Sequence, residues 1–166
     1  MMTRRTTWMR LAAAVAGLRG LFAGGPAGAA QPAAPREVVH TEAEWRALLT
    51  PAQFDVLRKA GTERPFSSPL DKEKRAGMFH CAGCRQALFS SAAKFDSGTG
   101  WPSFYQPVAR AAVDEETDRT LGIKRTEVLC HRCGGHLGHL FNDGPRPTGL
   151  RYCMNGLALA FTPGAA

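Results

Sequence analysis

Residues 130–155 of this chain, CHRCGGHLGHLFNDGPRPTGLRYCMN, hold the elements that we expect to fix the fold and to do chemistry. A Cys-x-x-Cys pair begins the stretch, two histidines follow at a spacing of three, and a turn-rich segment leads to Arg151, Cys153 and Asn155. A thiol becomes a strong nucleophile when a base or a cation nearby favours the thiolate. The stretch therefore predicts that Cys153 is a catalytic nucleophile.

A second Cys-x-x-Cys pair, Cys81 and Cys84, precedes the pair Cys130 and Cys133 by 45 residues. Two such turns present four thiolates to one tetrahedral ion, which is the ligand set of a closed, structural zinc site. The long gap indicates that the zinc would join two distant hairpins. Two disulfides, or one redox-active pair, are the alternatives.

Zinc would use four of the five cysteines and leave Cys153 alone. A lone cysteine is often an inert buried residue. Here Arg151 and Asn155 would lie on the same face of a strand as Cys153, and we place His136 and His139 in the loop before it. These neighbours favour a reactive thiol over an inert one.

The chain after residue 77 predicts an antiparallel β domain, because short β-like runs alternate with Gly, Pro and Asp turns. The expected strands are residues 77–81, 87–90, 108–114, 126–130 and 150–161. Before them we expect two short helices, capped by Thr41 and Thr50, with Trp45, Leu48, Leu49, Phe54 and Leu57 facing inward and Gly61 ending the second. Residues 62–77 are expected to form a surface loop.

Residues 1–36 predict a targeting leader and linker, and residues 37–166 the folded domain. The leader holds five of the 21 basic residues and no acidic one, so the other 130 residues balance 16 Lys and Arg against 14 Asp and Glu. This balance argues against nucleic-acid binding. Arg4, Arg5 and a broken apolar run indicate export to the periplasm by a Sec or twin-arginine signal, without a stable membrane span. An organellar transit peptide, or an uncleaved extension on a cytoplasmic protein, is the alternative.

The motifs of the domain resemble those of the methionine-R-sulfoxide reductases. The resemblance is carried by residues 81–84 (CAGC), 95–104 (FDSGTGWPSF), 130–133 (CHRC), 135–145 (GHLGHLFNDGP) and 150–155 (LRYCMN), and it covers about residues 40–163.

The resemblance implies a mainly β fold of two antiparallel sheets (β-tent-like) with short N-terminal helices, and one zinc ion on the four paired cysteines. It implies reduction of the R epimer of peptide-bound methionine sulfoxide, a protein-repair reaction, with thioredoxin as reductant. Cys153 aligns with the catalytic cysteine, and the implied helpers are Trp101, His136, His139, Asp143, Arg151 and Asn155.

The chemistry of a sulfoxide agrees with these roles. The thiolate of Cys153 would attack the sulfur while a histidine, His139 with His136 beside it, protonates the oxygen, which leaves a sulfenic acid. Trp101 would form an apolar wall for the S-methyl group, or would simply pack. Asp143 would orient a histidine, or would serve only as a turn residue.

One position departs from the family pattern. Many members have a second, resolving cysteine where this chain has Thr99. We therefore expect a cycle with a single catalytic cysteine, whose sulfenic acid is reduced directly by thioredoxin or by another thiol. We expect a monomer. The competing hypotheses are a non-enzymatic binding module stabilised by zinc and, more weakly, a metal-dependent hydrolase with His136 and His139 as ligands.

Overall fold

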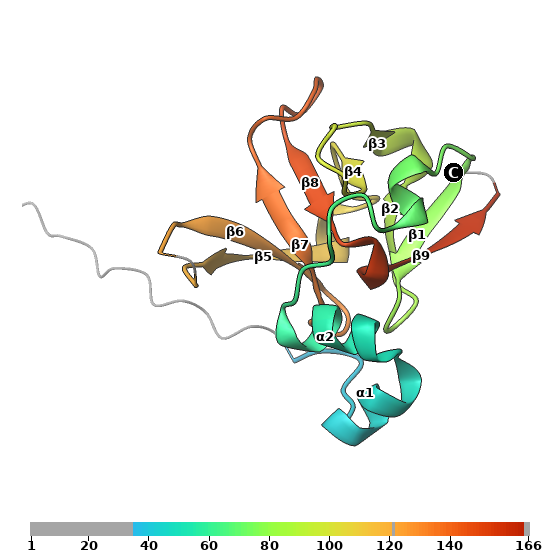
Figure 1. Cartoon of the computed structure of the whole chain (residues 1–166), viewed down its shortest axis with the longest axis vertical. Coiled ribbons are helices and arrows are strands. Elements are labelled where there is room, and N and C mark those ends of the chain that lie inside the picture. Colours follow the sequence, from blue (N-terminus) through green and yellow to red (C-terminus); the bar gives the residue numbers. More distant parts are fainter. Residues whose placement is uncertain (1–34, 121, 165–166) are drawn as a thin grey trace, which may run out of the picture. The chain divides into compact units, whose positions relative to one another are not determined.

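The computed structural model describes residues 35–120 and 122–164 of the chain. The predicted leader lies almost wholly outside these residues. Figure 1 shows a mainly β domain with two short helices before the strands. No helix in the described part of the chain has the length and apolar character needed to cross a membrane.

The two helices form where the sequence provides caps. Helix α1 (Glu42–Leu48) and helix α2 (Pro51–Lys59) each begin with a complete capping box, made by Thr41 with Glu44 and by Thr50 with Gln53. Trp45, Leu49, Phe54 and Leu57 are buried as predicted, but Leu48 is 59% exposed. Helix α2 ends at Lys59, and its C-cap is Ala60 in the left-handed conformation (φ 54°) rather than the expected Gly61.

Two antiparallel sheets make up the rest of the described domain, as predicted. The smaller sheet has the order β2-β1-β9, and the larger has the order β3-β4-β8-β7-β6-β5. The strands are β1 (Gly77–Cys81), β2 (Ala87–Ser90), β3 (Lys94–Phe95), β4 (Ser103–Phe104), β5 (Val113–Asp118), β6 (Arg125–Cys130), β7 (His136–Phe141), β8 (Arg151–Met154) and β9 (Leu159–Pro163).

Two strand predictions and one loop prediction need correction. Residues 110–112 of the expected strand 108–114 form a short 3-10 helix, η3 (Arg110–Ala112), and β5 begins only after it. The expected strand 150–161 is divided by the 3-10 helix η4 (Gly156–Ala158), which turns the chain from the larger sheet into the smaller one. The predicted loop 62–77 contains a third 3-10 turn, η1 (Pro69–Lys72); another, η2 (Ser91–Ala93), follows β2.

Aromatic rings from both sheets form the centre of the core. Phe79 of β1, Phe89 of β2 and Phe104 of β4 have no exposed surface. The ring centroids of Phe79 and Phe104 lie 4.9 Å apart, edge to face, and those of Phe89 and Phe104 lie 4.4 Å apart, stacked. Burial of such large side chains is the main favourable term in folding. Helix α2 contacts β7 and η4, and so supports the strand that carries the two histidines.

Candidate active site

The site forms around one row of side chains that crosses the larger sheet. Ser103 of β4 lies opposite Cys153 of β8, Cys153 lies opposite His139 of β7, and His139 lies opposite Glu127 of β6. Residues directly opposite each other in an antiparallel pair point to the same face of the sheet. The register therefore places the thiol next to an imidazole.

His136 and His139 lie on strand β7 and not in a loop, which corrects the prediction. In a regular strand, residues three positions apart point to opposite faces. An irregularity between β6 and β7, where Val128 pairs with Gly138 but Leu129 pairs with His136, adds one residue to β7. The bulge brings both histidines to one side, and their ring centroids lie 5.4 Å apart.

Each histidine has its own carboxylate. His136 Nδ1 lies 2.6 Å from Glu127 Oε1, and His139 Nε2 lies 2.9 Å from Asp118 Oδ2. Burial lowers the pKa of His136, while the hydrogen bond to Glu127 opposes that shift. His136 is 3% exposed, and its Nε2 has no hydrogen-bond partner among the described residues.

The Cys153 thiol lies in a partly buried environment that contains one strong cation. Burial raises the pKa of the thiol, whereas the charge of Arg151 and hydrogen bonds from Thr99 and Arg151 act in the opposite direction. Two hydrogen bonds of 2.8 Å, to the two carboxylate oxygens of Asp143, fix the Arg151 guanidinium. Asp143 therefore orients the arginine and not a histidine, which corrects one of its two predicted roles.

A small cavity of about 150 Å³ gives access to the thiol. Its lining comprises Thr62, Trp101, Arg125, Gly138, His139, Phe141, Cys153 and Asn155. Trp101 thus lines the same cavity as Cys153. The lining combines apolar rings with side chains that donate or accept hydrogen bonds, as is usual for small-molecule binding pockets.

The segment at Glu63 holds the walls of this cavity in place. The Glu63 carbonyl accepts a hydrogen bond from Trp101 Nε1 (3.2 Å), and its backbone amide donates to Asn155 Oδ1 (3.0 Å). The Glu63 carboxylate accepts from the amides of Gly156 (2.5 Å) and Leu157 (3.1 Å). Asn155 also donates from Nδ2 to the Leu137 carbonyl (3.2 Å). Its amide group is thus bonded at both ends, and it acts as a cross-link between β7 and the Glu63 segment.

The four paired cysteines converge on a metal-binding cluster. All four Sγ atoms lie within 4.8 Å of one another and are buried. Cys81 and Cys133 have their Sγ atoms 3.7 Å apart, and those of Cys84 and Cys130 are 3.5 Å apart. A tetrahedral zinc with bonds of about 2.3 Å to sulfur needs S···S edges of about 3.8 Å. A disulfide needs about 2.05 Å. The spacing fits a shared metal ion better than two disulfides.

Comparison with known proteins identifies the family. The SelR domain model matches residues 49–163. A peptide methionine sulfoxide reductase MsrB of Bradyrhizobium diazoefficiens is 57% identical over 127 residues, which cover 76% of this chain and 91% of that protein. An MsrB of Leptospira interrogans is 54% identical over 125 residues (75% and 95%), and one of Methanosarcina mazei is 52% identical over 129 (78% and 92%).

The chain belongs to the methionine-R-sulfoxide reductase family. The resemblance that its motifs indicated is confirmed, and so is the mainly β fold of two antiparallel sheets. As a methionine-R-sulfoxide reductase, the chain is an oxidoreductase that acts on oxidised methionine.

Four residues that contact this reductase site were not found from the sequence. Glu127, Asp118 and Arg125 lie on the β5–β6 hairpin, and Glu63 lies in the predicted surface loop. Charged residues in a hairpin usually face solvent, so their presence alone does not indicate a functional site. The one available signal was the alternation of Arg125 and Glu127, which places both on one face of a strand.

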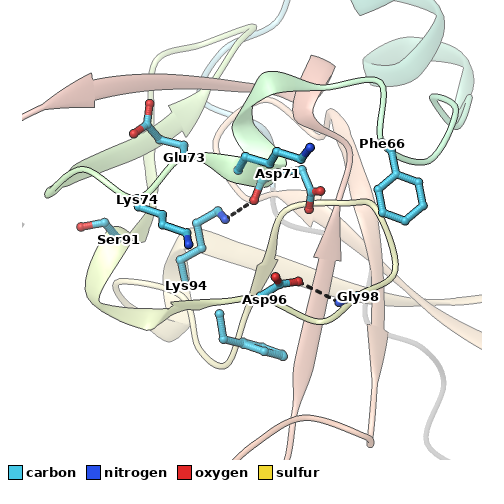
Figure 2. A pocket seen from close by; sticks show the side chains of 10 residues that line it. Phe66, Asp71, Glu73, Lys74, Ser91, Lys94, Asp96 and Gly98 are labelled. Atoms are coloured by element: carbon cyan, nitrogen blue, oxygen red, sulfur yellow. Dashed lines mark hydrogen bonds between the residues drawn. The ribbon is translucent and has the colours of Figure 1, made fainter.

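A cavity larger than the one at the thiol lies elsewhere in the described domain. It measures about 830 Å³ and includes Phe66, Lys74, Glu73 and Ser91. Figure 2 shows Lys94 pointing to the Asp71 carbonyl (2.6 Å) and Asp96 bonded to the Gly98 amide (2.9 Å). Glu73 pairs with Arg75 (2.6 Å). Its described lining contains neither a cysteine nor a histidine. The smaller cavity at Cys153 therefore remains the candidate for the chemistry.

Proposed function

We propose that this reductase converts the R epimer of peptide-bound methionine sulfoxide to methionine, with Cys153 as the nucleophile. The observation that carries the proposal is the placement of the Cys153 thiol directly across from His139, in a cavity that Trp101 also lines. A nucleophile beside a proton donor and an apolar wall is the arrangement that sulfoxide reduction needs.

In the reductive step the Cys153 thiolate attacks the sulfoxide sulfur while His139 gives a proton to the oxygen. The attack forms a bond between Cys153 Sγ and the substrate sulfur. That bond and the substrate S–O bond then break as the hydroxyl passes to Cys153 Sγ, so the thiolate loses two electrons and the substrate sulfur gains them as a thioether. Methionine leaves, and Cys153 becomes a sulfenic acid, which is the reversible stage of thiol oxidation. Arg151, held by Asp143, favours the thiolate against the effect of burial.

The substrate would lie with its S-methyl group against Trp101 and Phe141, which line the cavity together with His139. The hydrogen bond from Trp101 Nε1 to the Glu63 carbonyl fixes the indole plane. Asn155 supports the wall from behind, because both ends of its amide are already bonded within the protein. A fixed pocket of this size discriminates between epimers by shape.

Zinc is the metal that best fits the four-cysteine cluster, since four thiolates in a tetrahedral arrangement form a closed zinc site. The bound ion would supply no chemistry to the substrate and would hold the two Cys-x-x-Cys turns together. Cys133 is followed after two residues by His136, the first residue of β7. The metal thereby supports the strand that carries both histidines.

Regeneration of Cys153 needs an external thiol. The four other cysteines are in the cluster, and Thr99 occupies the position at which many family members would have the resolving cysteine. Two thiol equivalents, from thioredoxin or from a small thiol, would reduce the sulfenic acid to the thiol and release water. The leader at residues 1–36 would direct the domain to the periplasm, where it would repair oxidised proteins.

A stereospecific assay tests the proposal. The zinc-loaded protein is incubated with a peptide that holds either R or S methionine sulfoxide, and methionine is measured before any reductant is added. One methionine per protein from the R peptide is expected, with mass spectrometry finding one added oxygen at Cys153. Cys153→Ser should abolish the release while it keeps zinc and melting temperature. Turnover of the S peptide alone, or full activity in Cys153→Ser, would refute the proposal; the absence of any turnover would favour the binding module.

A further inference from the structure

The β5–β6 hairpin lies on the other side of β7 from β8, and its end reaches His139. Asp118 is the last residue of β5, Arg125 is the first residue of β6, and the two pair across the hairpin. Asp118 Oδ2 accepts hydrogen bonds from His139 Nε2 (2.9 Å) and Arg125 Nη2 (2.5 Å). Its Oδ1 accepts from the amide (2.8 Å) and the hydroxyl (2.6 Å) of Thr120. The carboxylate therefore has a single well-defined orientation.

The four hydrogen bonds also keep Asp118 ionised. Those from Thr120, and then the one from His139, hold the pKa of Asp118 below its usual value. The Asp118 side chain is 9% exposed and that of His139 is 14% exposed, so water screens their interaction only in part. An ionised carboxylate can only accept hydrogen bonds, so the His139 nitrogen that faces it carries a proton.

The contact also decides which nitrogen of His139 serves the substrate. Because Nε2 donates to Asp118, the other nitrogen, Nδ1, is left to exchange a proton. Among the described residues Nδ1 has no hydrogen-bond partner, and the ring lines the cavity with Cys153. His136 differs, since its unpartnered nitrogen is buried and the residue does not line that cavity.

We propose that Asp118 is a positioning residue of the reductase, which fixes the tautomer and the ring orientation of His139, and that Arg125 holds Asp118 in place. The inference rests on the proposed function, because it assigns to His139 the proton that the sulfoxide oxygen receives. A carboxylate behind a histidine fixes ring orientation in many sites, and its removal typically costs about 10–100-fold.

Other charged and titratable groups also surround His139. The groups that face it or adjoin it are Asp118 from β5, Arg125 and Glu127 from β6, His136 from β7, and Cys153 with Arg151 from β8. Glu127 is engaged by His136, and Arg125 is engaged by Asp118. Asp118 is therefore the carboxylate that acts on His139 directly.

The experiment is single-turnover methionine release from an R-sulfoxide peptide, without reductant, by the zinc-loaded Asp118→Asn variant between pH 5.5 and 9. At pH 7.5 the rate should fall about 10–100-fold, while the peptide concentration for half-maximal rate stays within about twofold. The loss should appear in the rate alone, because Asp118 contacts His139 and does not line the cavity that would hold the peptide. Alkylation of Cys153 by iodoacetamide should change little, since Asp118 touches the histidine and not the thiol.

Two variants control the result. Glu116→Gln removes an exposed carboxylate of the same strand, which lies 3.7 Å from Arg36, and should leave the rate unchanged. Arg125→Gln keeps the bond between Asp118 and His139, and should lose less than Asp118→Asn.

Three outcomes would overturn the inference. One is a wild-type rate in Asp118→Asn at every pH. Another is an equal loss at every pH together with loss of zinc or a lower melting temperature, which would make the role structural. The third is a larger loss in Arg125→Gln than in Asp118→Asn. If Cys153→Ser is inactive while Asp118→Asn is unaffected, this inference alone fails; if Cys153→Ser still releases methionine, the proposed function itself fails.

Discussion

At Gly138, the methyl group of an alanine should force strands β7 and β8 apart. A Cβ at this residue would lie 2.1 Å from the carbonyl oxygen of Cys153, and 3.0 Å from both the carbonyl carbon of Cys153 and the Cα of Met154. All three atoms belong to the backbone, so no side-chain rotation relieves the contact. Strands β7 and β8 would have to move apart by about 1 Å to reach the distance below which such contacts are essentially never seen.

The expected cost of Gly138→Ala follows from that displacement. The Leu137 carbonyl accepts hydrogen bonds from the Asn155 backbone (2.8 Å) and side chain (3.2 Å), and a shift of about 1 Å would break both. Two lost hydrogen bonds contribute about 2 kcal/mol, and residual overpacking adds about 1–3 kcal/mol. The free energy of unfolding should thus fall by about 3–5 kcal/mol, a large part of the stability of a typical domain.

Urea unfolding, followed by tryptophan fluorescence at a fixed zinc concentration, measures this cost. Single-turnover methionine release should also fall about 100-fold, because Cys153 and His139 would no longer face each other at the native distance. Gly149→Ala is the matched control, since open space surrounds the new methyl group and only the backbone conformation (φ +71°) opposes it. That variant should lose about 1 kcal/mol. If Gly138→Ala unfolds at the same urea concentration as Gly149→Ala and keeps its turnover, the close approach of the strands does not constrain the site.

Two further predictions concern charge and metal. Arg151→Met removes the cation that lowers the pKa of Cys153, so the rise that burial causes should be larger. Alkylation of Cys153 by iodoacetamide at pH 8 should then slow about tenfold or more. An unchanged alkylation profile would exclude Arg151 from thiol activation. In the same variant the acid dependence of stability should weaken, because Asp143, whose pKa Arg151 lowers, contributes stability above its unfolded pKa that is lost as pH falls through the folded value. A chelator should release one zinc per chain and lower the free energy of unfolding by about 5 kcal/mol. A protein that holds no metal and has the four cluster thiols oxidised would contradict the metal site.

Features that depend on neighbours in the sequence were predicted well. The capping boxes at Thr41 and Thr50 need only a spacing of three residues, and both are present. Strands β1 and β2 have the predicted bounds, because turn residues flank them closely. The convergence of the four cysteines also followed from local spacing, since each Cys-x-x-Cys turn contributes two sulfurs to one point.

Features that depend on strand register could not be predicted. Asp118 and Glu127 reach the histidines only because β5, β6 and β7 are neighbours in the sheet, and their order and alignment are set by the whole core. Strand β7 itself was missed, because its glycine lowers the strand signal of the segment. The role of Asp143, taken from the family resemblance and left open between orienting a histidine and forming a turn, also depends on the fold, because the chain turns after Phe141 and brings Asp143 to Arg151.

The bulge in β7 connects the metal cluster to the chemistry. The amide of Cys130 donates to the Gly135 carbonyl (2.8 Å), so the Cys130–Cys133 turn closes one residue before His136 begins the strand. A metal ion that fixes Cys133 would therefore fix the start of β7, and the extra residue at Leu137 then decides the face on which His139 lies. Without the bulge, a strand anchored at Cys133 would turn one of the two histidines away from the face that they share. The spacing Cys-x-x-His-x-x-His can thus serve Cys153 only when the irregularity is present, and Gly138 is the residue whose lack of a side chain allows β8 to approach there.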